Sequence, residues 1–218
     1  MPFEQQTRTK ILLWCDRHCC LCKKACGVNI EVHHLVPEGS GGSDDIDNAI
    51  PLCFDCHSEV TRYNDAHPRG NKYKIEELKA RREQVYEEFT RHLVPPINYH
   101  ITQTLRDGQS RTFPDVGFII SHLGDSLPIR ARILIDAVIQ DKKMILPFEH
   151  YSGKKLWNLN PRMTFSGHFE LPPEFVPESK SLELRVGVSI IDQYEREHFL
   201  LPVGYVYVSE GNYWYAEP

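Results

Sequence analysis

Residues 19–57 read CCLCKKACGVNIEVHHLVPEGSGGSDDIDNAIPLCFDCH, and this stretch decides how the front of the chain folds. Two C-x-x-C pairs, about thirty residues apart, bound it. Two such pairs can supply four thiolates to one tetrahedral Zn²⁺, in a closed site that serves structure. The residues between the pairs are too poor in apolar side chains to build a core, so metal binding would supply folding free energy. The sequence therefore predicts a structural zinc site made by Cys19, Cys22, Cys53 and Cys56.

The cysteine count supports metal ligation over disulfide bonding. The chain has seven cysteines, an odd number, and none lies after residue 56. Crowding of this kind, in a chain that begins without an apolar export segment, is typical of metal binding. The first pair leaves an alternative open, because Cys20 stands between the two expected ligands and Cys22-x-x-x-Cys26 is also a permissible pair. Cys15 and Cys20 are expected to be small buried apolar side chains.

Between the cysteine pairs lie two adjacent histidines, His33 and His34, then a Gly-Gly loop and Asn48, and His57 directly follows the second pair. A strand that ends in adjacent histidines points their side chains to opposite sides. One of them can then bind a metal while the other meets water.

This joint pattern resembles the HNH endonuclease family, with its ββα-metal fold, over about residues 10–66. The resemblance implies a metal-dependent enzyme that hydrolyses phosphodiester bonds in DNA. It implies that His33 and His57 hold the catalytic metal and that His34 is the general base, a task suited to an ordinary histidine pKa of about 6.5. Asn48 would orient the base and tie the loop to the hairpin, or touch the metal. Mg²⁺ or Mn²⁺ is the expected catalytic ion, and two histidines also accept Ni²⁺, Co²⁺ or Zn²⁺.

Helical patterns flank this region. Apolar residues recur at helical spacing over 3–17 and 75–93, and residues 54–65 suit a short helix. Pro95 and Pro96 should end the last helix, which predicts a boundary between a nuclease domain at 1–96 and a second domain at 97–218.

Strict alternation replaces the helical pattern after residue 97. Residues 129–139 and 182–190 alternate apolar and polar side chains, and shorter strand-like runs lie near 116–121, 142–147, 163–171 and 199–208. These runs predict an antiparallel β-sandwich of immunoglobulin-like size, and so an α+β chain. The sandwich has no catalytic signature, and we expect it to serve recognition, assembly or regulation through a protein partner or a second copy.

Two further features bear on partners. Basic residues collect after the second cysteine pair, where either a phosphate-binding track or a solvated helix face explains them; they are Arg62, Arg69, Lys72, Lys74, Lys79, Arg81 and Arg82. Aromatic residues gather near the C-terminus, where core and edge-strand packing is preferred to a binding surface that would include Trp157; they are Tyr205, Tyr207, Tyr213, Trp214 and Tyr215.

The whole-chain properties exclude some classes and leave rivals. The net charge of -5 offers no global attraction for DNA, and no apolar run is long enough for a membrane helix. We expect a cytoplasmic protein that acts on DNA, double-stranded and not necessarily at a specific sequence. The rivals are a non-catalytic zinc-dependent module that binds nucleic acid and a protein-interaction adaptor that works through the sandwich.

Overall fold

The computed structural model describes residues 3–62, 73–104, 115–139, 142–146, 156–169, 183–208 and 213–216. It divides the chain into two compact units, Met1–His92 and Leu93–Pro218, each with a hydrophobic core of its own. The first is a small mixed unit with a cysteine cluster, and the second is rich in antiparallel sheet, so the α+β class is confirmed. Among the helices of the described ranges, none is long and apolar enough to cross a membrane.

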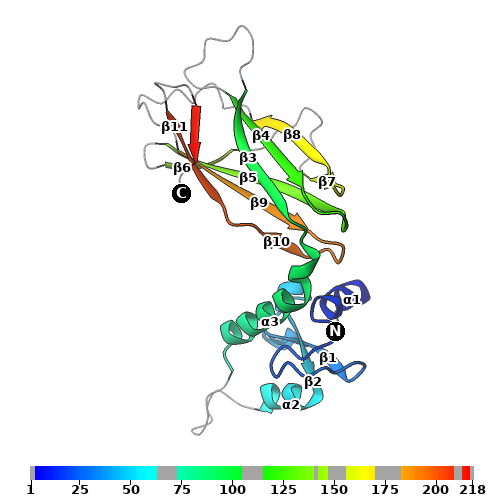
Figure 1. The fold of residues 1–218 in the computed structure, drawn as a ribbon. Coiled ribbons are helices and arrows are strands. Elements are labelled where there is room, and N and C mark those ends of the chain that lie inside the picture. The colour runs from blue at the N-terminus through cyan, green and yellow to red at the C-terminus, as the bar shows by residue number, and fades with distance from the viewer. Residues whose placement is uncertain are drawn as a thin grey trace. The chain divides into compact units, whose positions relative to one another are not determined.

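The first unit is a two-stranded hairpin packed between helices (Figure 1). Helices α1 and α3 contact each other and strand β2, whereas α2 contacts both strands. Its elements are α1 (Gln5–Trp14), β1 (Ile30–His34), β2 (Ala49–Cys53), α2 (Phe54–Arg62) and α3 (Ile75–Thr90). All five residues of β2 are buried, because helices cover it.

The helices lie where the periodicity predicted them, with shorter ends. α1 stops at Trp14 because Asp16 and Arg17 adopt the left-handed conformation (φ 44° and 53°) and turn the chain into the first cysteine pair. α3 is followed by a 3₁₀ turn over Arg91–Leu93. Residues 63–65 of the predicted second helix lie outside the described residues.

The second unit contains two antiparallel sheets that contribute to one hydrophobic cluster. One sheet has the order β3-β4-β8, and the other has the path β12-β11-β9-β5-β6, with β10 paired to β9 and β7 to β5. The strands are β3 (Ile97–Thr104), β4 (Asp115–His122), β5 (Ile129–Ile139), β6 (Lys142–Leu146), β7 (Trp157–Leu159), β8 (Thr164–Phe169), β9 (Glu183–Ile191), β10 (Glu197–Phe199), β11 (Val203–Val208) and β12 (Tyr213–Ala216). An immunoglobulin-like topology stays a prediction.

Alternation predicted the buried face of the long strands correctly wherever their side chains are described. Ile129, Ala131 and Ile133 of β5 are buried, as are Leu184, Val186, Val188 and Ile190 of β9. Ser189, expected on the polar face, is wholly buried as well. Its hydroxyl donates a hydrogen bond to Glu197 on the neighbouring β10, which covers this end of β9.

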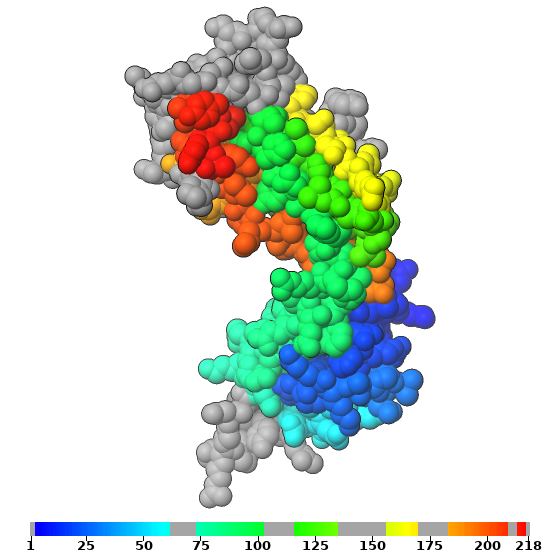
Figure 2. All heavy atoms as spheres, in the orientation of Figure 1, coloured from blue at the N-terminus to red at the C-terminus, as the bar shows by residue number. Residues whose placement is uncertain are grey.

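The C-terminal aromatic residues divide between core and surface. Tyr205 and Tyr207 of β11 are buried, and Trp157 lies in the same core. β12 ends the path of its sheet, and its residues, red in Figure 2, lie at the surface. Tyr213 and Tyr215 are about half exposed. The aromatic concentration is therefore largely core and edge-strand packing, with two rings facing solvent.

Candidate metal and catalytic site

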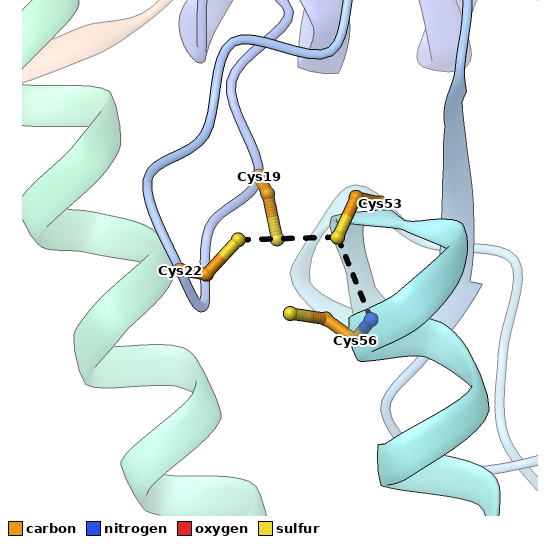
Figure 3. A group of neighbouring side chains, drawn as sticks. All are labelled: Cys19, Cys22, Cys53 and Cys56. Carbon is orange, nitrogen blue, oxygen red and sulfur yellow. Dashed lines mark hydrogen bonds between the residues drawn. The ribbon is translucent and has the colours of Figure 1, made fainter.

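The four predicted zinc ligands converge on one point (Figure 3). Cys19 and Cys22 lie on the loop after α1, Cys53 ends β2, and Cys56 lies in the first turn of α2. Their Sγ atoms all lie within 4.8 Å of one another, and those of Cys22 and Cys53 are 3.9 Å apart. Four thiolates around one Zn²⁺, with Zn–S bonds of about 2.3 Å, stand about 3.8 Å apart. The quartet therefore has the dimensions to hold a zinc ion.

The chemistry of the quartet also suits a cation. Burial raises the pKa of the Cys56 thiol, and hydrogen bonds with Cys53 and Cys22 raise it further. A thiol in such a crowd ionises at neutral pH only when a divalent cation balances the charge.

The other cysteines are engaged elsewhere. The Cys26 thiol donates to the carbonyl of Lys24 at 3.1 Å. Cys15 and Cys20 are both buried in the core, as expected, and the Cys15 thiol donates to the carbonyl of Leu12 at 3.6 Å.

The hairpin places the two adjacent histidines on opposite faces of β1. His33 shares its face with Glu31, two residues earlier, and both meet His57 on α2. His33 Nδ1 lies 3.0 Å from His57 Nε2. Two imidazole nitrogens that bind one cation at about 2.1 Å and at right angles are also about 3.0 Å apart. The pair can therefore bind one cation side by side.

Glu31 sets the direction in which His57 presents its lone pair. Its Oε2 lies 2.8 Å from His57 Nδ1. A carboxylate accepts the Nδ1–H, which leaves the Nε2 lone pair pointing toward His33. Burial, and next the charges of His57 and His34, lower the pKa of His33 to about 4. His33 is therefore neutral at pH 7, the state in which imidazole binds a metal.

His34 is held by different partners. Its Nε2 lies 2.8 Å from Asp44 Oδ1, and its ring stacks on Phe3 with centroids 3.9 Å apart and planes at 16°. When the Asp44 carboxylate accepts a hydrogen bond from Nε2–H, the nitrogen that keeps its lone pair is Nδ1. An imidazole with one nitrogen held by a carboxylate can act as a general base through its other nitrogen.

Asn48 ties the loop that carries Asp44. The amide is buried: its Oδ1 accepts the Val36 N–H at 2.8 Å, and its Nδ2 donates to the carbonyls of Val36 at 3.0 Å and Ser43 at 2.8 Å. Its three hydrogen bonds thus go to loop backbone, and any orienting effect on His34 passes through the loop. At Gly42 a Cβ would lie 1.8 Å from the Val36 carbonyl oxygen, so this second glycine of the Gly-Gly loop has to be glycine.

A pocket of about 380 Å³ lies against the three histidines and Glu31. It is lined by Phe3, Arg8, Glu31, Val32, His33, His34, Pro37, Glu38 and His57. Sequence reasoning missed Phe3, Arg8, Glu31 and Asp44. The alternation of β1 was a usable signal for Glu31, whereas Asp44 reaches His34 only through the conformation of a loop.

Three of the basic residues that follow the second cysteine pair make contacts within the protein. Lys79 pairs with Asp47, and Arg81 with Glu77 on the same helix. Arg82 is buried, and its Nη1 donates to the carbonyl of Ala49 in β2. Arg69 and Lys72 lie outside the described residues, as does the side chain of Arg62.

Comparisons with known proteins agree with this geometry. The model of the HNH endonuclease family matches residues 18–62. A 31-residue segment is 52% identical to the type IV methyl-directed restriction enzyme EcoKMcrA of Escherichia coli (strain K12). That segment is 14% of this chain and 11% of the restriction enzyme, so the similarity concerns only a small part of either protein. Residues 18–62, which hold both cysteine pairs and the three histidines of the pocket, are thus the part of the chain that matches the HNH endonuclease family.

Proposed function

We propose that this protein is a metal-dependent endonuclease that hydrolyses phosphodiester bonds in DNA. The observation that carries the proposal is the convergence of His33, His34 and His57 on one pocket beside a cysteine quartet of zinc-site dimensions. The family match over residues 18–62 and the similarity to a restriction enzyme support a nuclease-type function.

In this proposal two metals have separate tasks. Zn²⁺ in the quartet of Cys19, Cys22, Cys53 and Cys56 holds the first cysteine pair against the hairpin and α2. His33 and His57 hold a second divalent ion, Mg²⁺ or Mn²⁺, with Ni²⁺, Co²⁺ and Zn²⁺ as further candidates. When bound, that ion neutralises charge on the phosphate and on the leaving oxygen.

The protein's own residues perform the proton transfer. His34 Nδ1 accepts a proton from water as the water oxygen bonds to phosphorus and the bond to the leaving oxygen breaks. Asp44, 2.8 Å from Nε2, stabilises the imidazolium that forms. Asn48 keeps the Asp44 loop closed through Val36 and Ser43. Arg8 lines the pocket from α1 and is a candidate partner for a phosphate oxygen.

The second unit supplies no group to this chemistry in our proposal. We infer that it recognises a partner or a second copy of the chain, and the two exposed tyrosines of β12 offer contact area. Substituting Tyr213 and Tyr215 together by serine should leave metal-dependent cutting intact. It should weaken self-association or partner capture, measured by sedimentation and affinity purification.

We also propose a cytoplasmic location.

Plasmid cleavage tests the nuclease. Purified protein is assayed with Mg²⁺, Mn²⁺ or neither, as wild type, as His34→Ala, and as His100→Ala, which removes an exposed histidine of the second unit. We expect metal-dependent cutting by wild type and His100→Ala, and loss of cutting in a His34→Ala protein that retains its zinc. DNA binding without turnover in any metal would instead identify a non-catalytic module. Absence of any affinity for nucleic acid would favour an adaptor.

A further inference from the structure

A residue outside the matched HNH segment touches the proposed general base. Phe3 precedes α1, is 4% exposed, and stacks face to face on the His34 ring. It belongs to the hydrophobic cluster of the first unit and also lines the pocket. The ring therefore connects the core of the unit with the group that receives the proton.

The two contacts of His34 restrain different motions. Asp44 holds the ring at one atom, Nε2, and the carboxylate itself is about half exposed. One hydrogen bond leaves the imidazole plane free to tilt. The parallel ring of Phe3, at 3.9 Å and 16°, blocks tilting over the whole face. An aliphatic side chain would fill the same space without matching a planar partner.

We propose that Phe3 is a positioning residue of the nuclease, which holds the His34 imidazole in the plane from which Nδ1 reaches the attacking water. The inference rests on the proposed function, because it requires His34 to be the general base. It makes the segment before α1 a working part of the catalytic pocket. Small displacements of a catalytic group cost up to about 100-fold in rate. Loss of the stack should therefore lower kcat.

The test compares Phe3→Leu, which keeps bulk but loses the planar ring, with Phe3→Tyr, which keeps the ring. Ile11→Val is the matched control, since Ile11 is buried in the same cluster on α1 and makes no stack with His34. All are made in the full chain, and zinc content and melting temperature establish that each is folded. We expect Phe3→Leu to lower kcat about tenfold, with KM for DNA and Mn²⁺ affinity changed less than about twofold. Phe3→Tyr should restore kcat, and Ile11→Val should keep it.

A second measurement does not depend on activity. Protons that lie over an aromatic face resonate upfield, so the His34 ring protons should move downfield in Phe3→Leu and stay in place in Ile11→Val. If they do not move, the stack is absent in solution and the proposal is overturned, whatever the nuclease does. Unchanged kcat in a folded Phe3→Leu protein overturns the role of Phe3 and leaves the nuclease standing. A wild type that fails to cut DNA with every metal tested overturns both.

Discussion

At the residue scale, His33 is a histidine kept neutral by its neighbours. Burial lowers its pKa from 6.5 to about 4, and the charges of His57 and His34 contribute in the same direction. In zinc-loaded protein without the catalytic cation, His57→Ala should raise the pKa of His33 toward 6.5, because it removes one of these charges and admits water. An NMR titration of the His33 ring measures this, with His92→Ala as control. An unmoved midpoint contradicts it.

The same shift has a consequence for stability. The folded pKa of His33 lies below the unfolded value of 6.5, so the unfolded chain takes up this proton first as pH falls. Between about pH 6.5 and pH 4 the His33 contribution should lower the free energy of unfolding, and above pH 6.5 it should be constant. In His33→Gln that part of the pH dependence should disappear from urea unfolding curves measured at several pH values.

Glu31 is the second residue whose effect can be isolated. Its contact with His57 Nδ1 orients one of the two proposed ligands of the catalytic cation. Glu31→Ala should weaken Mn²⁺ binding by about 10- to 100-fold, and Glu31→Gln by less, because its amide oxygen still accepts the hydrogen bond. Calorimetric titration in a His34→Ala background measures this without turnover. The control Glu59→Ala removes an exposed carboxylate from α2 and should leave Mn²⁺ affinity unchanged. Equal losses of Mn²⁺ affinity in Glu31→Ala and Glu59→Ala would refute the role of Glu31.

At the element scale, α3 holds the residues around Asn48 through one buried side chain. Nη1 of Arg82 donates to the carbonyls of Asp47 at 2.8 Å and Ala49 at 2.9 Å, and Nη2 lies 3.1 Å from Asp47 Oδ1. Asp47 and Ala49 directly precede and follow Asn48 in the sequence. Although α3 lies beyond the segment that matches the family, it is therefore an integral part of the first unit.

Removing that side chain should destabilise the unit. Arg82→Ala leaves a buried carbonyl without its donor, at a cost of about 1–3 kcal/mol. Arg81→Ala, one residue earlier, breaks only an exposed pair with Glu77 and should cost under about 0.5 kcal/mol. Urea denaturation of the two variants makes the comparison, and equal losses would show that Arg82 does not support the loop.

The elements also show what sequence could predict. Periodicity located the three α-helices of the described ranges and the long strands β5 and β9, because burial of one face produces a regular pattern in the sequence. β3, β7, β10 and β12 were not predicted as strands. β7, β10 and β12 are only three or four residues long and carry little alternation. β3 does alternate, with Ile97, Tyr99 and Ile101 on one face, and its signal was overlooked. The partners of Arg82 could not be predicted either, because they are backbone carbonyls more than thirty residues earlier in the chain.

For the site as well, sequence could predict residues with a recognisable spacing but not those brought together only by folding. The histidines, Asn48 and the cysteine quartet were predictable because spacing along the chain identifies them. Phe3 and Asp44 were not predictable. Phe3 lies in the segment before α1 and Asp44 in the loop after β1, and the paths of both segments depend on packing.

At the scale of the whole molecule, the two units should respond separately to loss of zinc. Each has its own hydrophobic cluster, and all seven cysteines belong to the first. Chelation of zinc should therefore unfold the first unit and leave the second folded. Calorimetry with and without a chelator tests this, and restoring zinc should restore the lost transition. One transition that disappears as a whole would mean that the units fold together.

The cysteine quartet also acts on the unfolded chain. Cys22 and Cys53 are 31 residues apart, and joining them through one ion closes the chain between them into a ring. A permanent cross-link over a ring of that size removes unfolded-state entropy worth about 4 kcal/mol. If the link were a disulfide bond, a strong thiol reductant would break it and remove this stabilisation. A link through zinc is not reduced, and it depends instead on the concentration of free zinc. The stability of the first unit should thus follow the concentration of free zinc.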